Sequence, residues 1–135
     1  MRSFNVLVVD DDPFMARHTQ LMLRRGGIAG TCLEMGSGAA ALDYLRRAPR
    51  HGLDLLLLDL HMPDLGGFDV LAAYEGLPAQ QRAKVLVVLS ASSLASDIER
   101  AMLHPCVADY LLKPLDGQQI HFLALLMQSQ LARQG

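Results

Sequence analysis

The chain has 135 residues, of which 51% are hydrophobic and 19% are charged, and its formal net charge is −2. This length fits one domain, and the chain lacks the basic excess that direct binding of nucleic acid requires. The N-terminal apolar run is too short for a signal peptide, and no stretch approaches the ~20 apolar residues of a membrane span. We expect a single cytoplasmic domain over 1–135, with a short flexible tail at about 130–135.

Apolar runs of strand length alternate with helix-like segments along the chain. They predict strands at 6–9, 28–33, 53–58, 85–89 and 107–112. Because the runs are nearly continuous, each strand should be covered on both faces, as in a parallel sheet. The alternation predicts an α/β fold of five βα units with helices on both sides of a five-stranded sheet.

Five helical segments are expected between and after these strands. The first is marked by a shared face of Phe14, His18, Leu21, Met22 and Arg25. Further helices are predicted from about 38 after a cap at Ser37, over 67–75, over 95–103 and after Asp116. The last should bury Ile120, Leu123, Ala124 and Met127. The two cysteines, Cys32 and Cys106, fit neither a metal site nor a disulfide framework and are interpreted as small buried side chains.

Polar side chains follow four of the five strands, namely Asp10 with Asp11, Asp59, Ser90 and Lys113. The carboxyl ends of parallel strands share one edge of the sheet, where ligands bind in open α/β folds. If the strand order is 2-1-3-4-5, the first and third strands lie about 4.8 Å apart. Asp59 should then lie beside Asp10 and Asp11.

Three neighbouring carboxylates repel one another, so a cation is expected between them. Mg²⁺ suits an all-oxygen site that also takes a phosphate. One carboxylate can then act as a nucleophile toward phosphorus, while Lys113 and the hydroxyl of Ser90 stabilise the phosphoryl oxygens.

The motifs VLVVDDDP, LLLLDLHMPDLGG, VLVVLSA and DYLLKP follow one another at the four strand ends. In this order and spacing the chain resembles the receiver domain of two-component response regulators over essentially its whole length. The resemblance implies a flavodoxin-like (βα)5 fold with strand order 2-1-3-4-5.

The resemblance also implies a role for each residue of the acidic pocket. Asp59 would be the phosphoryl acceptor, Asp11 a direct Mg²⁺ ligand and Asp10 a ligand through water. The backbone carbonyl of His61 would complete the metal site. The side chains of His61 and Ser92 occupy positions that influence how fast the family loses its phosphoryl group.

The same resemblance implies roles for residues at the ends of the fourth and fifth strands. Ser90 would bond a phosphoryl oxygen, Lys113 would pair with the phosphoryl group, and Tyr110 would change rotamer as Ser90 moves inward. The Lys113–Pro114 peptide bond is expected to be cis. The alternative for Tyr110 is a half-buried core aromatic.

Three local features depart from, or add to, the family pattern. The chain has Leu65-Gly66-Gly67 where the family often has Met-Asp-Gly, so only Gly67 matches and the loop is expected to be more mobile. Serine replaces the commoner threonine at Ser90, which keeps the hydroxyl. Asp12 followed by Pro13 is typical of a helix cap and is interpreted as structural.

The expected function is a signalling switch rather than a turnover enzyme. A sensor histidine kinase or histidine phosphotransfer protein would donate the phosphoryl group, and a downstream protein would read the surface around the fourth helix, fifth strand and fifth helix. No nucleic acid or membrane is expected as a direct partner, no output domain is expected in the chain, and a monomer or weak homodimer is expected. A phosphorelay intermediate and a receiver cut from a longer regulator stay open.

Two other classes use a similar sheet. A haloacid-dehalogenase-type phosphatase needs a second carboxylate two residues after its nucleophile, where this chain has His61. A flavodoxin-like FMN carrier needs a phosphate-binding loop after the first strand, where this chain has carboxylates that would repel phosphate.

Overall fold

The computed structural model describes residues 3–48, 50–63 and 65–134. Strands and helices alternate along the chain as β1 (Phe4–Val9), α1 (Pro13–Arg25), β2 (Ala29–Met35), α2 (Gly38–Arg47), β3 (Leu55–Leu58), α3 (Gly67–Glu75), a 3-10 helix η1 (Ala79–Gln81), β4 (Val85–Ser90), α4 (Ala95–Met102), β5 (Val107–Leu112) and α5 (Gly117–Gln134).

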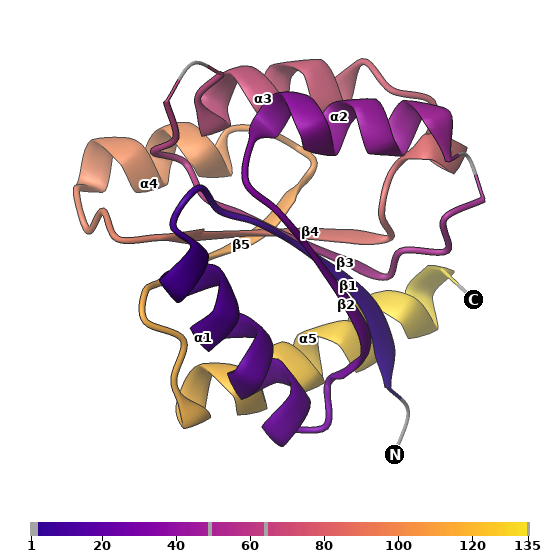
Figure 1. Cartoon of the computed structure of the whole chain (residues 1–135), viewed down its shortest axis with the longest axis vertical. Helices are drawn as coiled ribbons and strands as arrows, with labels where there is room; N and C mark the ends of the chain where they lie inside the picture. Colours follow the sequence, from indigo (N-terminus) through magenta and orange to yellow (C-terminus); the bar gives the residue numbers. More distant parts are fainter. Residues whose placement is uncertain (1–2, 49, 64, 135) are drawn as a thin grey trace.

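The five strands form one parallel sheet in the order β2-β1-β3-β4-β5. Helices α2, α3 and α4 cover one face, and α1 and α5 cover the other (Figure 1). Val9, the last residue of β1, pairs in register with Leu58, the last residue of β3. The predicted flavodoxin-like fold and strand order are confirmed, and the ends of β1 and β3 lie side by side.

The sheet separates two hydrophobic cores, which explains the continuous apolar runs. Leu56 and Leu58 of β3 pack under α2 and α3, whereas Leu55 and Leu57 pack against α1 and α5. All four side chains are at most 1% exposed. A strand buried on both faces requires apolar residues at every position, because successive side chains point to opposite faces.

The buried face of helix α1 differs from the face of Phe14, Leu21 and Met22 that marked the helix in the sequence. Its buried residues are Ala16, Thr19 and Leu23, whereas Phe14 is 87% exposed and Leu21 is exposed as well. The small side chains of Ala16 and Thr19 thus face inward together with Leu23. The distribution of large side chains therefore did not identify the inner face.

Helix α5 continues through the segment that was expected to be a flexible tail. It ends at Gln134, and Leu131 is 8% exposed because it joins the core beneath α1 and α5. The segment is thus helical as far as residue 134, its flexibility stays a prediction, and Gly135 lies outside the described residues. Ile120, Leu123 and Met127 are buried as predicted, whereas Ala124 is only half-buried.

The cysteines are free, and both side chains are half-buried where small buried side chains were expected. Cys32 and Cys106 pack at the margins of the two cores. Burial raises the pKa of each thiol to about 11, which keeps both protonated near neutral pH.

Within the described residues, no helix combines the length and apolar composition needed to cross a bilayer.

Candidate functional site

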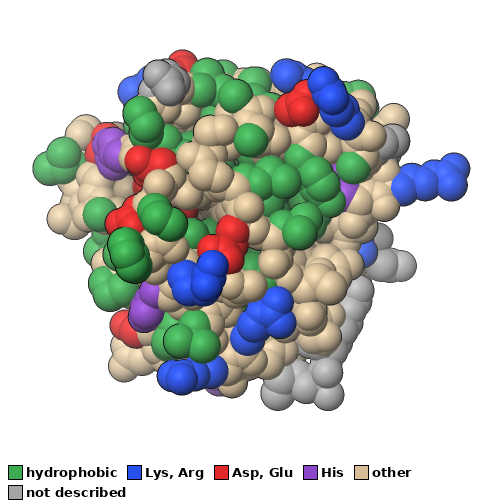
Figure 2. All heavy atoms as spheres, in the orientation of Figure 1, with side chains coloured by type: hydrophobic (Ala, Val, Ile, Leu, Met, Phe, Trp, Pro, Cys, Tyr) green, Lys and Arg blue, Asp and Glu red, His purple; other side chains and the backbone are tan. Residues whose placement is uncertain are grey.

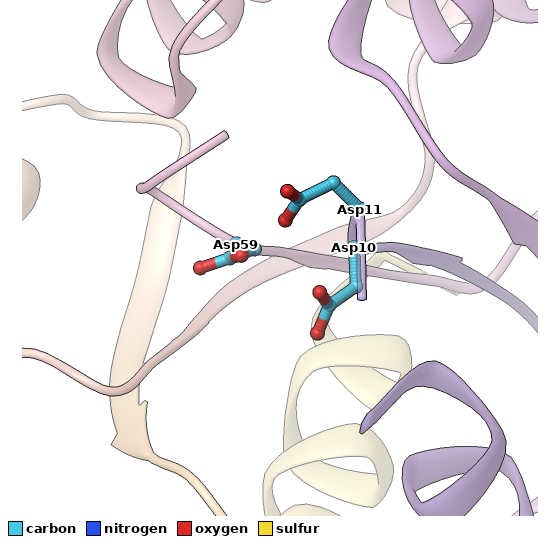
Figure 3. A group of neighbouring side chains, drawn as sticks. All are labelled: Asp10, Asp11 and Asp59. Carbon is cyan, nitrogen blue, oxygen red and sulfur yellow. The ribbon is translucent and has the colours of Figure 1, made fainter. Parts of the chain in front are cut away.

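The site begins with three carboxylates at adjacent strand ends. Backbone hydrogen bonds continue the sheet there, from Asp10 N to Met35 O at 3.0 Å and from Asp59 N to Val9 O at 3.0 Å. The sheet thereby fixes Asp59 beside Asp10 and Asp11 (Figure 3). One carboxylate oxygen of each residue lies within 4.8 Å of those of the other two.

The donor set and its burial fit a hard divalent cation. Asp10 and Asp59 are 4% and 5% exposed, whereas Asp11 is open to solvent. Three carboxylates this close together repel strongly, and a cation between them removes that repulsion. Oxygen ligands on one open side suit an ion that keeps several of its waters. The acidic triad is therefore able to bind a metal ion.

Lys113 follows β5 and reaches into the same pocket. Its ammonium lies 2.5 Å from Asp10 Oδ2 and 3.2 Å from Asp59 Oδ2, and its side chain is only 8% exposed. The backbone N–H of Lys113 donates to Ser90 O at 2.9 Å, which fixes the residue against the end of β4. The Lys113–Pro114 peptide bond is cis, as predicted.

The charge of Asp59 is set by opposing influences. Burial raises the pKa of this carboxyl, Lys113 opposes the rise, and the negative charge of Asp10 adds to it. The backbone N–H of His61 also donates to Asp59 Oδ1 at 3.3 Å and favours the ionised form. The net pKa is raised, so Asp59 gains from any added positive charge in the pocket.

Asp12 serves the helix rather than the acidic triad. Its Oδ1 accepts from Phe14 N at 3.0 Å and from Met15 N at 3.3 Å, and Pro13 occupies the first helical position. The N–H of Asp12 donates to Asp10 Oδ1 at 2.9 Å. The predicted capping role is observed, and the cap also orients Asp10.

Gly67 lies where α3 passes closely over the end of β3. A Cβ there would lie 2.3 Å from Leu60 Cα and 2.7 Å from the carbonyl oxygen of Asp59. The N–H of Gly67 donates to Leu60 O at 2.8 Å. Only glycine permits this approach, which holds the backbone that carries Asp59. The neighbouring Asp64 lies outside the described residues.

Ser90, Ser92 and Tyr110 form a connected group at the end of β4. Ser90 is fully buried, and its Oγ accepts from Ser92 N at 3.1 Å. The Tyr110 hydroxyl donates to Ser92 O at 2.7 Å. Ser90 and Tyr110 are thus linked through the backbone of Ser92.

His61 and Ser92 meet at a residue that sequence reasoning missed. Asp97, in the first turn of α4, accepts from Ser92 Oγ at 2.6 Å, and its Oδ2 lies 3.2 Å from His61 Nε2. Nothing in the spacing pointed to Asp97, because it follows no strand and reads as an ordinary acidic residue near a helix N-terminus.

Comparison with known proteins identifies the family. The model of the response regulator receiver domain matches residues 6–124. The chain belongs to the response regulator receiver domain family. Receiver domains are modules of two-component phosphorelay signalling rather than turnover enzymes, so the phosphatase and FMN-carrier alternatives are set aside.

Similar proteins come from distant sources. Over 117 residues, 85% of this chain, the receiver is 35% identical to the nitrate/nitrite response regulator protein NarP of Escherichia coli K12, and it covers 50% of that protein. A receiver protein of Dyadobacter fermentans is 29% identical with a TM-score of 0.81, over 93% of this chain and 96% of that one.

A third similar protein is the phosphorylated cyanobacterial phytochrome response regulator RcpA. It is 26% identical with a TM-score of 0.77, and the match covers 98% of this chain and 96% of that chain. The receiver thus spans about half the length of NarP but nearly all of the two solved proteins.

Proposed function

We propose that this receiver is a phosphorylation-dependent switch in which Asp59 accepts a phosphoryl group from a phosphohistidine of a sensor histidine kinase or phosphotransfer protein. The observation that carries the proposal is Lys113 held between Asp10 and Asp59 beside a set of metal-binding oxygens. The phosphorylated state of RcpA supports it.

The phosphoryl transfer needs only the donor's phosphohistidine, Asp59 and a proton from solvent. A carboxylate oxygen of Asp59 attacks phosphorus, the phosphorus–nitrogen bond of the donor breaks, and its electron pair stays on the imidazole, which takes a proton from solvent. Lys113 stabilises the charge on the phosphoryl oxygens, and the Ser90 hydroxyl donates to one of them.

We assign Asp10, Asp11 and Asp59, with the backbone carbonyl of His61, as the groups that would hold Mg²⁺. When bound, the ion would neutralise charge on the carboxylates and the phosphoryl group. Asp10 has one oxygen engaged by Asp12 N–H and the other by Lys113. This supports a ligand role through water for Asp10 and a direct one for Asp11.

The signalling surface is proposed to lie over α4, β5 and α5. Large hydrophobic side chains are exposed there, namely Leu94 (64%), Met102 (43%), Leu103 (81%), Leu112 (40%), Phe122 (38%) and Leu125 (53%). Figure 2 shows hydrophobic side chains next to acidic ones and a histidine on the side where α4 lies. Exposed apolar groups rimmed by charge are typical of protein interaction sites.

The coupling would run through Ser90, Ser92 and Tyr110. Phosphorylation adds roughly −1.5 to −2 of charge at Asp59, which attracts the Ser90 hydroxyl and Lys113. The hydrogen bond from Tyr110 to Ser92 would then stabilise one arrangement of the surface over another already sampled. Three roles are compatible with this coupling, namely a stand-alone switch that is monomeric or weakly dimeric, a phosphorelay intermediate, and the receiver of a longer regulator.

The proposal is tested by incubating the chain with acetyl phosphate and Mg²⁺ and measuring its intact mass. The native chain should gain one phosphoryl group, and both Asp59→Asn and the native chain in EDTA should gain none. A native chain that stays unmodified, or an Asp59→Asn variant modified to the same extent, contradicts the proposal.

A further inference from the structure

Helix α4 buries little of its own surface and is also held by specific polar contacts. Of its residues, Ala101 is fully buried, and the helix contacts β5. Its polar links include the hydrogen bonds of Asp97 and the guanidinium of Arg100, which lies 3.9 Å from the centre of the Phe68 ring on α3. The position of α4 therefore depends on a small number of specific contacts.

Asp97 joins two loops through a single oxygen. Its Oδ2 accepts from Ser92 Oγ at 2.6 Å and lies 3.2 Å from His61 Nε2. Ser92 Oγ also accepts from Leu94 N at 3.3 Å, so the start of α4 is tied into the same group.

Both partners of Asp97 are attached directly to the reaction site. The N–H of His61 donates to Asp59 Oδ1 at 3.3 Å, and the N–H of Ser92 donates to Ser90 Oγ at 3.1 Å. The side chains of His61 and Ser92 are thus tied together across the gap between the β3 and β4 ends. We call this three-residue group of His61, Ser92 and Asp97 the latch.

Loss of the phosphoryl group requires water to reach that gap. The water oxygen attacks phosphorus in line with the bond to Asp59, that bond breaks, its electron pair returns to the carboxylate, and inorganic phosphate leaves. The water must approach from the side of phosphorus away from Asp59. The two loops that the latch joins are expected to border that side, because the N–H of His61 donates to Asp59 Oδ1 and the N–H of Ser92 donates to Ser90 Oγ.

We propose that Asp97 is a positioning residue. It keeps the side chains of His61 and Ser92 bound to one oxygen, which limits the access of water to phosphorus and thereby prolongs the lifetime of the phosphorylated state. This inference rests on the proposed phosphorylation of Asp59. Asp97 need not contact the phosphoryl group. From its place on α4 it would control both the access of water and the position of this helix in the signalling surface.

The test compares phosphoryl lifetimes in Asp97→Ala, Asp97→Asn and the matched control Glu99→Ala. Glu99 is an exposed acidic residue of the same helix and lies outside the latch. Each chain is phosphorylated with acetyl phosphate and Mg²⁺ and freed of donor, and the loss of phosphoryl mass is followed. Asp97→Ala should lose phosphate about five-fold faster, as expected for one lost hydrogen-bonded contact. Glu99→Ala should match the native rate.

The conservative variant separates positioning from a general effect of charge. Both contacts use one oxygen of Asp97, and asparagine keeps an acceptor oxygen. Asp97→Asn should therefore restore most of the lifetime, and Asp97→Ala should add little acceleration when His61 and Ser92 are already alanine. Thermal unfolding midpoints of the singly substituted chains should stay close to the native value.

Three outcomes would overturn the inference. An Asp97→Ala lifetime equal to or longer than the native one removes the role of the latch. Equal acceleration by Asp97→Asn, or full acceleration in the His61→Ala, Ser92→Ala background, shows that Asp97 does not act through these partners. If no chain takes up phosphate, the proposed function itself fails, which is a different result from phosphorylation with unchanged lifetimes.

Discussion

Asp59 carries its charge at a cost to the folded chain when no cation is bound. Burial and Asp10 raise the pKa of its carboxyl against the attraction of Lys113. The folded chain therefore binds a proton at Asp59 more readily than the unfolded chain, and stability is lost as pH rises through the folded pKa.

Asp59→Asn should consequently raise the unfolding temperature of the chain in EDTA at neutral pH. The gain should shrink as the pH falls through the folded pKa and disappear below about 3.9, where aspartate is protonated in both states. Thermal unfolding followed by circular dichroism across this range measures it. A variant less stable than the native chain at neutral pH would contradict the assigned balance.

Asp11 and Asp12 are neighbours with different tasks, and their variants should differ accordingly. Asp12→Ala removes the hydrogen bonds to Phe14 N and Met15 N and should cost about 1 kcal/mol of stability while phosphorylation persists. Asp11→Ala should abolish Mg²⁺-dependent phosphorylation and leave stability in EDTA unchanged or higher. Denaturant titration and intact mass measure the two effects, and equal losses of phosphorylation would refute the division.

At the scale of elements, the β3–α3 connection depends on Gly67. Gly67→Ala brings a methyl group against the backbone of Leu60 and Asp59 and should destabilise the chain by about 1–3 kcal/mol. Phosphorylation should also slow, because the backbone that carries Asp59 must shift. Gly66→Ala is the matched control, since its Cβ would find no atom nearer than 3.7 Å and its backbone is extended. Similar losses in both variants would argue against the close approach.

The elements themselves follow from the sequence, but the rotation of one helix does not. Each predicted strand exists within a few residues of its expected bounds. The expected burial on both faces is confirmed for β1, β3 and β4 but is wrong for β2 and β5, because these two strands form the edges of the sheet and most of their residues are half-buried or exposed. Helix α1 carries large side chains on more than one side, and it buries the small Ala16 and Thr19 together with Leu23. The helical end of the chain was also not predicted, because the burial of Leu131 comes from its packing against the core that α1 and α5 cover.

For the whole molecule, parallel topology explains why the site could be largely predicted. Residues that follow parallel strands must meet at one edge of the sheet, so the sequence predicts that Asp10, Asp59 and Lys113 lie together, as they do. Asp97 belongs to a helix start, and its contacts with His61 and Ser92 depend on how α4 packs. The rule that residues following parallel strands meet at one edge does not predict the position of a residue within a helix.

Binding of Mg²⁺ should stabilise the whole domain, because the unfolded chain does not hold three carboxylates together. At roughly 100-fold above its Kd, a ligand that binds only the folded state adds about 2.7 kcal/mol. The unfolding temperature of the native chain should rise with added Mg²⁺, and that of Asp11→Ala should rise far less. Equal shifts in the two chains would place the ion elsewhere.

The central claim is that Asp59, among three neighbouring carboxylates, takes the phosphoryl group. Reducing the phosphorylated chain with borohydride converts an acyl-phosphate aspartate into homoserine, and peptide mass spectrometry then locates the change. The account predicts homoserine at position 59 alone. Homoserine at position 10 or 11, or at no position in a chain that has gained phosphate, would contradict it.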